Sequence, residues 1–251
     1  MNIILAPYFT KRIGYHQHDS TNGGKGGSNP DDYELIAPWY ESVKRLGLHA
    51  RIFHNELSDG VVEALETDEI KFVYWGEEHR PSYNDERFYA YYSYLQNHDA
   101  DMVFATDLYD VKFLRDPFEV IAGYHAEHAQ WPLHSVPIDD HIFSGSEVLT
   151  KYSSKWMRRK CSEMDTSLPY SLYRPGELLY NAGIIGGRKK AVLKLMKCML
   201  GEMNGIGKQF NANMPVYNLC IGRCGFVYSG YPLHNVFGSF KADPGTYIMH
   251  K

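Results

Sequence analysis

The chain has 251 residues, of which 44% are hydrophobic and 22% are charged, and its formal net charge at pH 7 is −4. This composition allows a sizeable hydrophobic core and excludes a wholly disordered chain. The slight acidic balance gives no sign of nucleic acid or an anionic membrane as a partner.

The sequence predicts one cytoplasmic domain covering residues 1–251. The apolar start, MNIILAPYF, is soon interrupted by Pro7, whereas a secretory signal needs a longer apolar stretch and a cleavage site. No window approaches the ~18 apolar residues of a membrane span. The four cysteines lack the paired spacing that is typical of zinc sites, so we expect free thiols in a reducing compartment.

The N-terminal half predicts alternating strands and helices. A glycine-rich loop follows the first strand, but it lacks the Gly-Lys-Ser/Thr ending of a phosphate-binding Walker loop. We expect the next helix to begin at a cap on Ser28 or Asn29, to kink at Pro38 and to end at Gly47. A later amphipathic helix is expected to begin at a cap on Asn84 or Asp85. The predicted strands are 2–7, 49–55, 70–76 and 101–106, with helices over 28–47 and 84–98.

This alternation is typical of an open α/β sheet with mostly parallel strands. In such sheets, ligands bind beyond the carboxyl ends of the strands. Asp107 and Asp110 follow the predicted strand 101–106 directly, so they stand at such an end.

The second half is less regular and contains no internal repeat. The segment ELLYNAGIIGGRKK predicts a strand and a glycine turn that leads into a strong helix. Helices are expected over 117–128, 152–164, 188–203 and 213–222, a loop with a short strand over 130–150, and β structure over 225–240 and 246–251.

The two acids at the strand end have three explanations. They could cap a following turn, act as general acid and base, or hold a divalent cation. Carboxylate oxygens suit Mn²⁺ or Mg²⁺, and these ions normally share their site with substrate phosphates. The strand-end position and the apolar approach favour the metal explanation.

The stretch FATDLYDVKF, continued by DPF, resembles the metal-binding motif of GT-A glycosyltransferases. It is most similar to the glycosyltransferase domain of multifunctional collagen lysyl hydroxylases, which use Asp-x-x-Asp. Four further features match in order over nearly the whole chain: the pair Tyr74 and Trp75, Arg87, the segment LLYNAGIIGG, and a histidine near the C-terminus.

The resemblance implies a single GT-A domain with a mixed, mostly parallel sheet, in which residues 1–118 bind the nucleotide and residues 119–251 bind the acceptor. It implies that Asp107, Asp110 and His250 bind Mn²⁺ or Mg²⁺, with His234 as the competing third ligand. The cation would bridge the diphosphate of a nucleotide-sugar.

The same resemblance assigns residues to the donor nucleotide. Tyr74 or Trp75 would stack on the base, and Pro7 and Tyr8 would frame the nucleoside. The cationic side chains near the diphosphate would be Arg12, Arg87 and Lys251, each of which could instead be an ordinary surface or paired residue.

The resemblance also suggests that Asn181 hydrogen-bonds the donor sugar, although a tight turn explains the segment NAGIIGG as well. Where many relatives place an Asp, this chain has Asn211 and Asn213 in NANMPVYN, which removes an obvious general base and favours retention of configuration. Glu177, Asp139 and Asp140 remain as acids, with a cap or surface loop as the alternative. The candidate catalytic residues are therefore Asp110, Asn181, Glu177 and Asp140.

The predicted activity is the transfer of a sugar from a nucleotide-sugar, of the UDP type by analogy, to a glycan, protein or other hydroxyl-bearing acceptor. A nucleic-acid acceptor is not favoured, because duplex binding relies on Lys and Arg contacts to phosphates. Two alternatives stay open. One is a nucleotidyltransferase that makes nucleotide-sugars, since residues 21–30 are glycine-rich, and the other is a catalytically silent binding module.

Overall fold

A computed structural model describes residues 1–10, 29–128, 140–150, 153–164, 176–208, 211–223, 226–235 and 241–250. Its strands are β1 (Ile3–Tyr8), β2 (Ala50–His54), β3 (Ile70–Tyr74), β4 (Met102–Thr106), β5 (Val111–Phe113), β6 (Ile142–Thr150), β7 (Leu178–Arg188), β8 (Val227–Ser229) and β9 (Ile248–His250). Its helices are η1 (Tyr33–Leu35), α1 (Ala37–Arg45), α2 (Asp59–Leu65), α3 (Tyr83–Asn97), α4 (Phe118–His128), α5 (Lys155–Glu163), α6 (Lys189–Asn204) and α7 (Asn213–Ile221).

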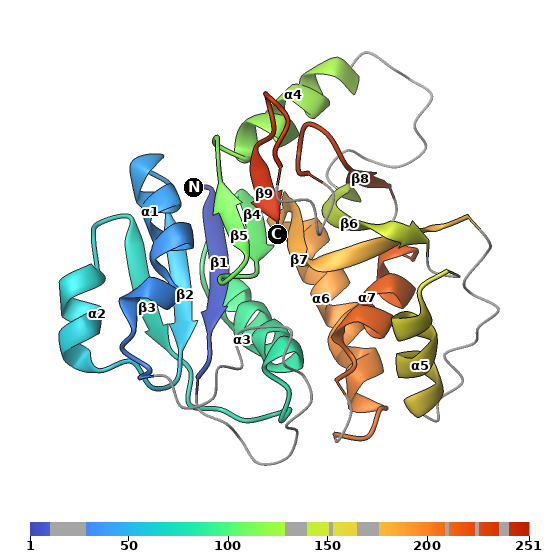
Figure 1. The fold of residues 1–251 in the computed structure, drawn as a ribbon, viewed down its shortest axis with the longest axis horizontal. Helices are drawn as coiled ribbons and strands as arrows, with labels where there is room; N and C mark the ends of the chain where they lie inside the picture. Colours follow the sequence, from blue (N-terminus) through green and yellow to red (C-terminus); the bar gives the residue numbers. More distant parts are fainter. Residues whose placement is uncertain are drawn as a thin grey trace.

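The described residues form a seven-stranded sheet in the order β3-β2-β1-β4-β7-β6-β8 (Figure 1). Strands β3, β2, β1 and β4 are parallel neighbours, and β6 and β8 are also parallel. Strand β7 runs antiparallel to both of its neighbours, β4 and β6. The structure thus confirms an α/β fold with a mixed, mostly parallel sheet, and both predicted halves of the chain contribute strands to it.

The central strand β1 is an apolar run that is buried along almost its whole length. Pro7 has no N–H to donate, and it lies beyond Leu5, the last residue of β1 that pairs with β4. The proline is therefore tolerated at the end of a central strand, where one side of the ladder has already ended.

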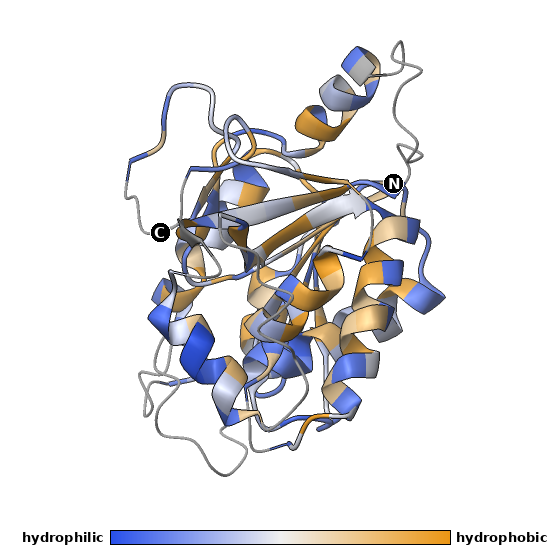
Figure 2. Ribbon diagram, turned by 90° about the vertical axis from the view of Figure 1, so that its right-hand side faces the viewer, coloured by the Kyte–Doolittle hydropathy of each residue, from blue (hydrophilic) through white to orange (hydrophobic). Residues whose placement is uncertain are grey.

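Helices cover both faces of the sheet, which gives three layers. Helices α3, α6 and α7 pack on one face through a core that includes Phe88, Leu195 and Val216. Helices α1 and α4 pack on the other face, around Trp39 and Ile121. Figure 2 shows hydrophobic residues running through the strands and through the helices packed against them.

Three helices of the N-terminal half differ from the predictions. Helix α2, capped by the Ser58 side chain, lies between β2 and β3 and was not expected. It supplies the crossover that two neighbouring parallel strands require. Helix α1 begins at Ala37, so Pro38 stands in its first turn and causes no kink. Helix α3 has Ser82 as its N-cap, ahead of the expected Asn84 or Asp85.

The expected glycine turn in LLYNAGIIGG is instead part of β7, which continues without a break from Leu178 to Arg188. Its pairing with β6 shifts register twice, between Ser144 and Gly145 and between Ser146 and Thr150. Such bulges bend strands and redirect side chains, and they are frequent beside functional sites.

A second, two-stranded sheet joins β5 to β9 in antiparallel register. It places the segment that follows β4 beside the last described strand, and Figure 1 shows β9 lying next to β5 and β4. The described part of the chain contains no helix of the length and apolarity needed to cross a membrane. Cys161, Cys198 and Cys220 form no disulfide with one another, and Cys224 lies outside the described residues.

Candidate metal centre

Three possible metal ligands meet at the carboxyl end of β4. One ligand atom from each of Asp107, Asp110 and His250 can be chosen so that all three lie within 4.8 Å of one another. The Nε2 atom of His250 lies 3.9 Å from Oδ2 of Asp107 and 3.6 Å from Oδ2 of Asp110. These three residues, here called the metal centre, are the group that the sequence predicted.

The secondary structure positions each member of the metal centre. Asp107 follows the last residue of β4 directly, and Asp110 precedes β5. His250 ends β9 and pairs with Val111, the residue next to Asp110. Residues about 140 positions apart in the chain therefore become neighbours through the small β5–β9 sheet.

Gly183 on β7 keeps space open at the metal centre. Its backbone oxygen accepts a hydrogen bond of 2.9 Å from the backbone N–H of Asp107. A Cβ atom at position 183 would lie 2.5 Å from Oδ2 of Asp107 and 2.6 Å from Cε1 of His250. A side chain here would therefore occupy the space toward which the carboxylate and the imidazole point.

The guanidinium of Arg87, buried on α3, forms an ion pair with Oδ1 of Asp107. It also donates to the backbone oxygen of Ala182 at 3.3 Å. Burial lowers the pKa of Arg87, and the nearby Asp110 is among the groups that oppose this shift. Arg87 thus offsets one of the two acidic charges and leaves Oδ2 of Asp107 facing the metal centre.

The residues of the metal centre fit a hard divalent cation. Two carboxylates and an imidazole are an N,O donor set that suits Mn²⁺, and Mg²⁺ accepts the oxygen donors. The Oδ1 atom of Asp110 is buried and has no hydrogen-bond partner among the described residues. A buried carboxylate oxygen without a donor is costly unless a cation satisfies it. The group can therefore hold a metal ion, as the sequence predicted.

Asn235 fixes the backbone of His250 on both sides. Its Oδ1 accepts from the His250 N–H at 2.7 Å, and its Nδ2 donates to the His250 oxygen at 3.1 Å. His234, the competing ligand of the sequence prediction, instead contacts Ser229, Gly230 and Asn235 through its ring nitrogens. The structure therefore brings His250, and not His234, into the metal centre.

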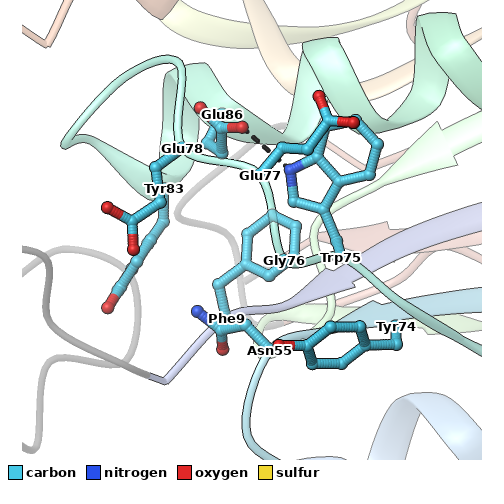
Figure 3. A pocket seen from close by; sticks show the side chains of 9 residues that line it. All are labelled: Phe9, Asn55, Tyr74, Trp75, Gly76, Glu77, Glu78, Tyr83 and Glu86. Carbon is cyan, nitrogen blue, oxygen red and sulfur yellow. Dashed lines mark hydrogen bonds between the residues drawn. The ribbon is translucent and has the colours of Figure 1, made fainter.

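A pocket beyond the ends of β1 and β3 contains the aromatic pair that was expected to bind a base (Figure 3). The Trp75 indole is fixed by a 2.8 Å hydrogen bond from Nε1 to Oε1 of Glu86. Tyr74 is 69% exposed, so its ring remains available to a ligand. The pocket is lined by Phe9, Asn55, Tyr74, Trp75, Gly76, Glu77, Glu78, Tyr83 and Glu86.

A second pocket connects this region with the metal centre. Pro7, Arg87 and Asp107 line it, together with Phe9 and Tyr83, which also line the first pocket. Tyr8 is buried beside this pocket; its hydroxyl donates to the Pro30 oxygen and its ring lies 5.9 Å from that of Tyr109. Pro7, Tyr8, Tyr74, Trp75 and Arg87 thus lie on one side of the metal centre, whereas Arg12 and Lys251 lie outside the described residues.

Asn181 lies beside the metal centre, but both ends of its amide are engaged. Its Oδ1 accepts from the Gly183 N–H at 2.7 Å, and its Nδ2 donates to Oε1 of Glu147 at 3.2 Å. Glu147 comes from the irregular part of β6, and the sequence analysis did not identify it. Burial raises the pKa of Glu147, while the Asn181 hydrogen bond and His250 oppose this shift.

Asp140 and Glu177 are not members of the group of possible metal ligands, and Asp139 lies outside the described residues. Asp140 precedes β6, whose first residue pairs with Gly187. That position is six residues along β7 from Asn181, or about 20 Å in an extended strand. Glu177 precedes β7, and its charge acts on Tyr180. Comparison of the sequence with protein-family models and with curated proteins gives no match.

Proposed function

We propose that this protein is a metal-dependent glycosyltransferase that moves a sugar from a nucleotide-sugar to a hydroxyl-bearing acceptor. The observation that carries the proposal is the grouping of Asp107, Asp110 and His250 at the carboxyl end of a central strand. Open α/β sheets bind their ligands in this position. The adjoining pockets supply aromatic and cationic side chains on one side of the same centre.

The strand order supports the proposal. A parallel unit of β3, β2, β1 and β4 is followed by the antiparallel β7, and a small β5–β9 sheet delivers the last ligand. This arrangement agrees with the GT-A fold that the sequence resembles, in which the N-terminal half binds the nucleotide and the C-terminal half binds the acceptor.

In the proposed reaction, Asp107, Asp110 and His250 hold Mn²⁺ or Mg²⁺. The cation, when bound, neutralises charge on the departing nucleoside diphosphate. Trp75 and Tyr74 hold the base, which is uracil by the resemblance, and Pro7 contacts the nucleoside from the second pocket. Tyr8 is buried behind this wall and supports it without touching the ligand. Arg87 holds Asp107 in position and adds a positive charge next to the phosphates. The acceptor is a glycan, a protein or another alcohol, in preference to nucleic acid.

Retention of configuration, which the sequence favoured, stays a prediction. It depended on the lack of a carboxylate in NANMPVYN, but Glu147 supplies one next to Asn181.

The test is release of free nucleotide from a panel of UDP-, GDP- and other nucleotide-sugars, with and without Mn²⁺. We expect slow hydrolysis of one donor that depends on Mn²⁺ and is lost in Asp110→Ala. If no donor is cleaved and calorimetry detects neither Mn²⁺ nor nucleotide binding, the transferase proposal fails and a silent module is favoured. Synthesis of a nucleotide-sugar from a nucleoside triphosphate and a sugar phosphate would instead identify a nucleotidyltransferase.

A further inference from the structure

Glu147 is connected to the metal centre by consecutive hydrogen bonds. Its Oε1 accepts from Asn181 Nδ2 at 3.2 Å, and Asn181 Oδ1 accepts from the Gly183 N–H at 2.7 Å. The Gly183 oxygen in turn accepts from the Asp107 N–H at 2.9 Å. These hydrogen bonds link four residues in series, from Glu147 on β6 through Asn181 and Gly183 on β7 to Asp107 at the end of β4.

The irregular pairing of β6 and β7 produces this arrangement. Gly145 is opposite Asn181 and Ser146 is opposite Tyr180, but the next paired residue of β6 is Thr150, opposite Leu178. Glu147 therefore stands in a stretch of β6 that has more residues than its partner strand. Bulges of this kind change where a side chain points, and here the Glu147 carboxylate reaches the amide of Asn181.

The two oxygens of Glu147 have different surroundings. Oε1 is held by Asn181, whereas Oε2 has no hydrogen-bond partner among the described residues, and the side chain is partly exposed. Glu147 takes part in no salt bridge with a described residue. A carboxylate that is oriented by one oxygen and open at the other can accept a proton from a hydroxyl group that approaches from solvent.

We infer that Glu147 is the catalytic base of the transfer and that Asn181 is the residue that positions it. This inference rests on the proposed function. The acceptor O–H gives its proton to Oε2 of Glu147, and the acceptor oxygen forms the bond to the anomeric carbon of the sugar. The bond from that carbon to the diphosphate oxygen breaks, and its electron pair stays on the nucleoside diphosphate.

The inference changes the role of Asn181. With both amide ends already engaged inside the protein, Asn181 acts through Glu147 and not by direct contact with the donor sugar. Direct displacement assisted by a base also predicts that the anomeric configuration is inverted. The raised pKa of Glu147 supports the role, because a base works best when its pKa lies closer to the working pH.

The experiment compares wild type, Glu147→Gln, Asn181→Ala and a control variant, Glu63→Gln, on the donor that wild type hydrolyses fastest with Mn²⁺. Water then serves as the acceptor. Glu63 is an exposed residue of α2 at the far edge of the sheet, so its variant should match wild type. We expect kcat to fall 100-fold or more in Glu147→Gln, with Mn²⁺ and nucleotide affinities within about 2-fold of wild type, and to fall about 10-fold in Asn181→Ala.

Two further measurements separate catalysis from a structural role. The wild-type rate should rise with pH across an ionisation that is missing in Glu147→Gln. Added formate should restore part of the rate of Glu147→Ala, because a small carboxylate can enter the vacated space. Inversion at the anomeric carbon, followed by NMR, completes the expected result.

Several outcomes would overturn the inference. An unchanged kcat in Glu147→Gln would do so. A fall in the Mn²⁺ affinity of Glu147→Gln as large as the fall in its kcat would do so too, as would retention of configuration in the wild-type reaction. A Glu147→Gln variant that does not fold would also contradict it, because a partly exposed base should contribute little to the fold. If wild type itself binds Mn²⁺ but hydrolyses no donor, the proposed function fails first, and this is visible before any variant is compared.

Discussion

Gly183 and Asp107 are neighbours on β7 and at the end of β4, and the lack of a side chain on the glycine leaves room for the Asp107 carboxylate. The hypothetical Cβ of residue 183 would lie only 2.5 Å from Asp107 Oδ2. We therefore expect Gly183→Ala to weaken Mn²⁺ binding by about 10- to 100-fold or more, as measured by calorimetry. Gly201→Ala on α6 is the matched control, since a Cβ there meets nothing within 4 Å. Equal Mn²⁺ affinity in both variants would contradict the proposed geometry.

The two aspartates of the metal centre should differ in their effect on stability. Asp107 pairs with the buried Arg87, whereas Asp110 Oδ1 has no hydrogen-bond partner among the described residues. Asp107→Ala leaves a buried guanidinium without its carboxylate and should cost about 3–5 kcal/mol of unfolding free energy. Asp110→Ala should leave the metal-free protein at least as stable as wild type. Urea unfolding in the presence of a chelator measures both, and equal losses would argue against this assignment.

Asn235 should matter for metal binding although it is not a ligand. Its side chain makes two hydrogen bonds to the backbone of His250, so Asn235→Ala frees the last ligand to move. We expect Mn²⁺ affinity to fall about 10- to 100-fold, and to fall further in His250→Ala. His234→Ala should lower thermal stability more than Mn²⁺ affinity, because His234 bonds Ser229 and Gly230. Calorimetric titration with Mn²⁺ measures the affinity of the three variants, which should be lowest in His250→Ala and highest in His234→Ala.

Trp75 should account for much of the nucleotide affinity. Stacking of a base on an aromatic ring contributes about 1–3 kcal/mol, so Trp75→Ala should weaken UDP binding roughly 5- to 150-fold. Trp75→Phe should recover part of this loss, since it keeps a ring but gives up the hydrogen bond to Glu86. Trp156→Ala on the remote helix α5 provides the control. If Trp75→Ala leaves the UDP affinity unchanged, the base does not bind in this pocket.

The buried His54 should make the free energy of unfolding depend on pH. Burial lowers the pKa of His54, with opposition from Asp59 and Glu66. The folded state therefore binds fewer protons than the unfolded state, and this contribution to stability is present above about pH 6.5 and is lost as the pH falls below it. His54→Phe, between the rings of Phe72 and Tyr74, should make the unfolding free energy less steep below pH 6.5. The slope should not vanish, because burial also lowers the pKa of His234. An unchanged slope would contradict this account.

The sequence was sufficient to predict the parts of the metal centre that depend on local pattern. An apolar run followed by Asp107 and Asp110 predicts a buried strand that ends just before the two carboxylates, and β4 (Met102–Thr106) confirms that strand and its end. His250 was preferred to His234 through the resemblance, and the β5–β9 pairing brings it to the aspartates. Local spacing alone could not have made that choice, because the pairing joins distant segments.

Features that depend on strand register were missed. Glu147 stands in an ordinary strand pattern, SGSEVLT, and only the irregular pairing with β7 directs it toward Asn181. The glycines of LLYNAGIIGG suggested a turn, but at Gly186 the glycine makes room for the ring of Phe104 on the neighbouring strand. Helix α2 was overlooked because its seven residues are too few for a clear amphipathic pattern.

The pairing of β5 with β9 ties metal binding to the order of folding. Two ligands follow the end of β4, but the third arrives only after about 140 further residues have folded and β9 has docked. Contacts between such distant segments form late, because closing a long loop costs chain entropy. A cation that binds only the docked strand would shift the docking equilibrium toward the complete structure. The ion would then bind only chains in which β9 has docked, and it would stabilise the completely folded state over partly folded ones.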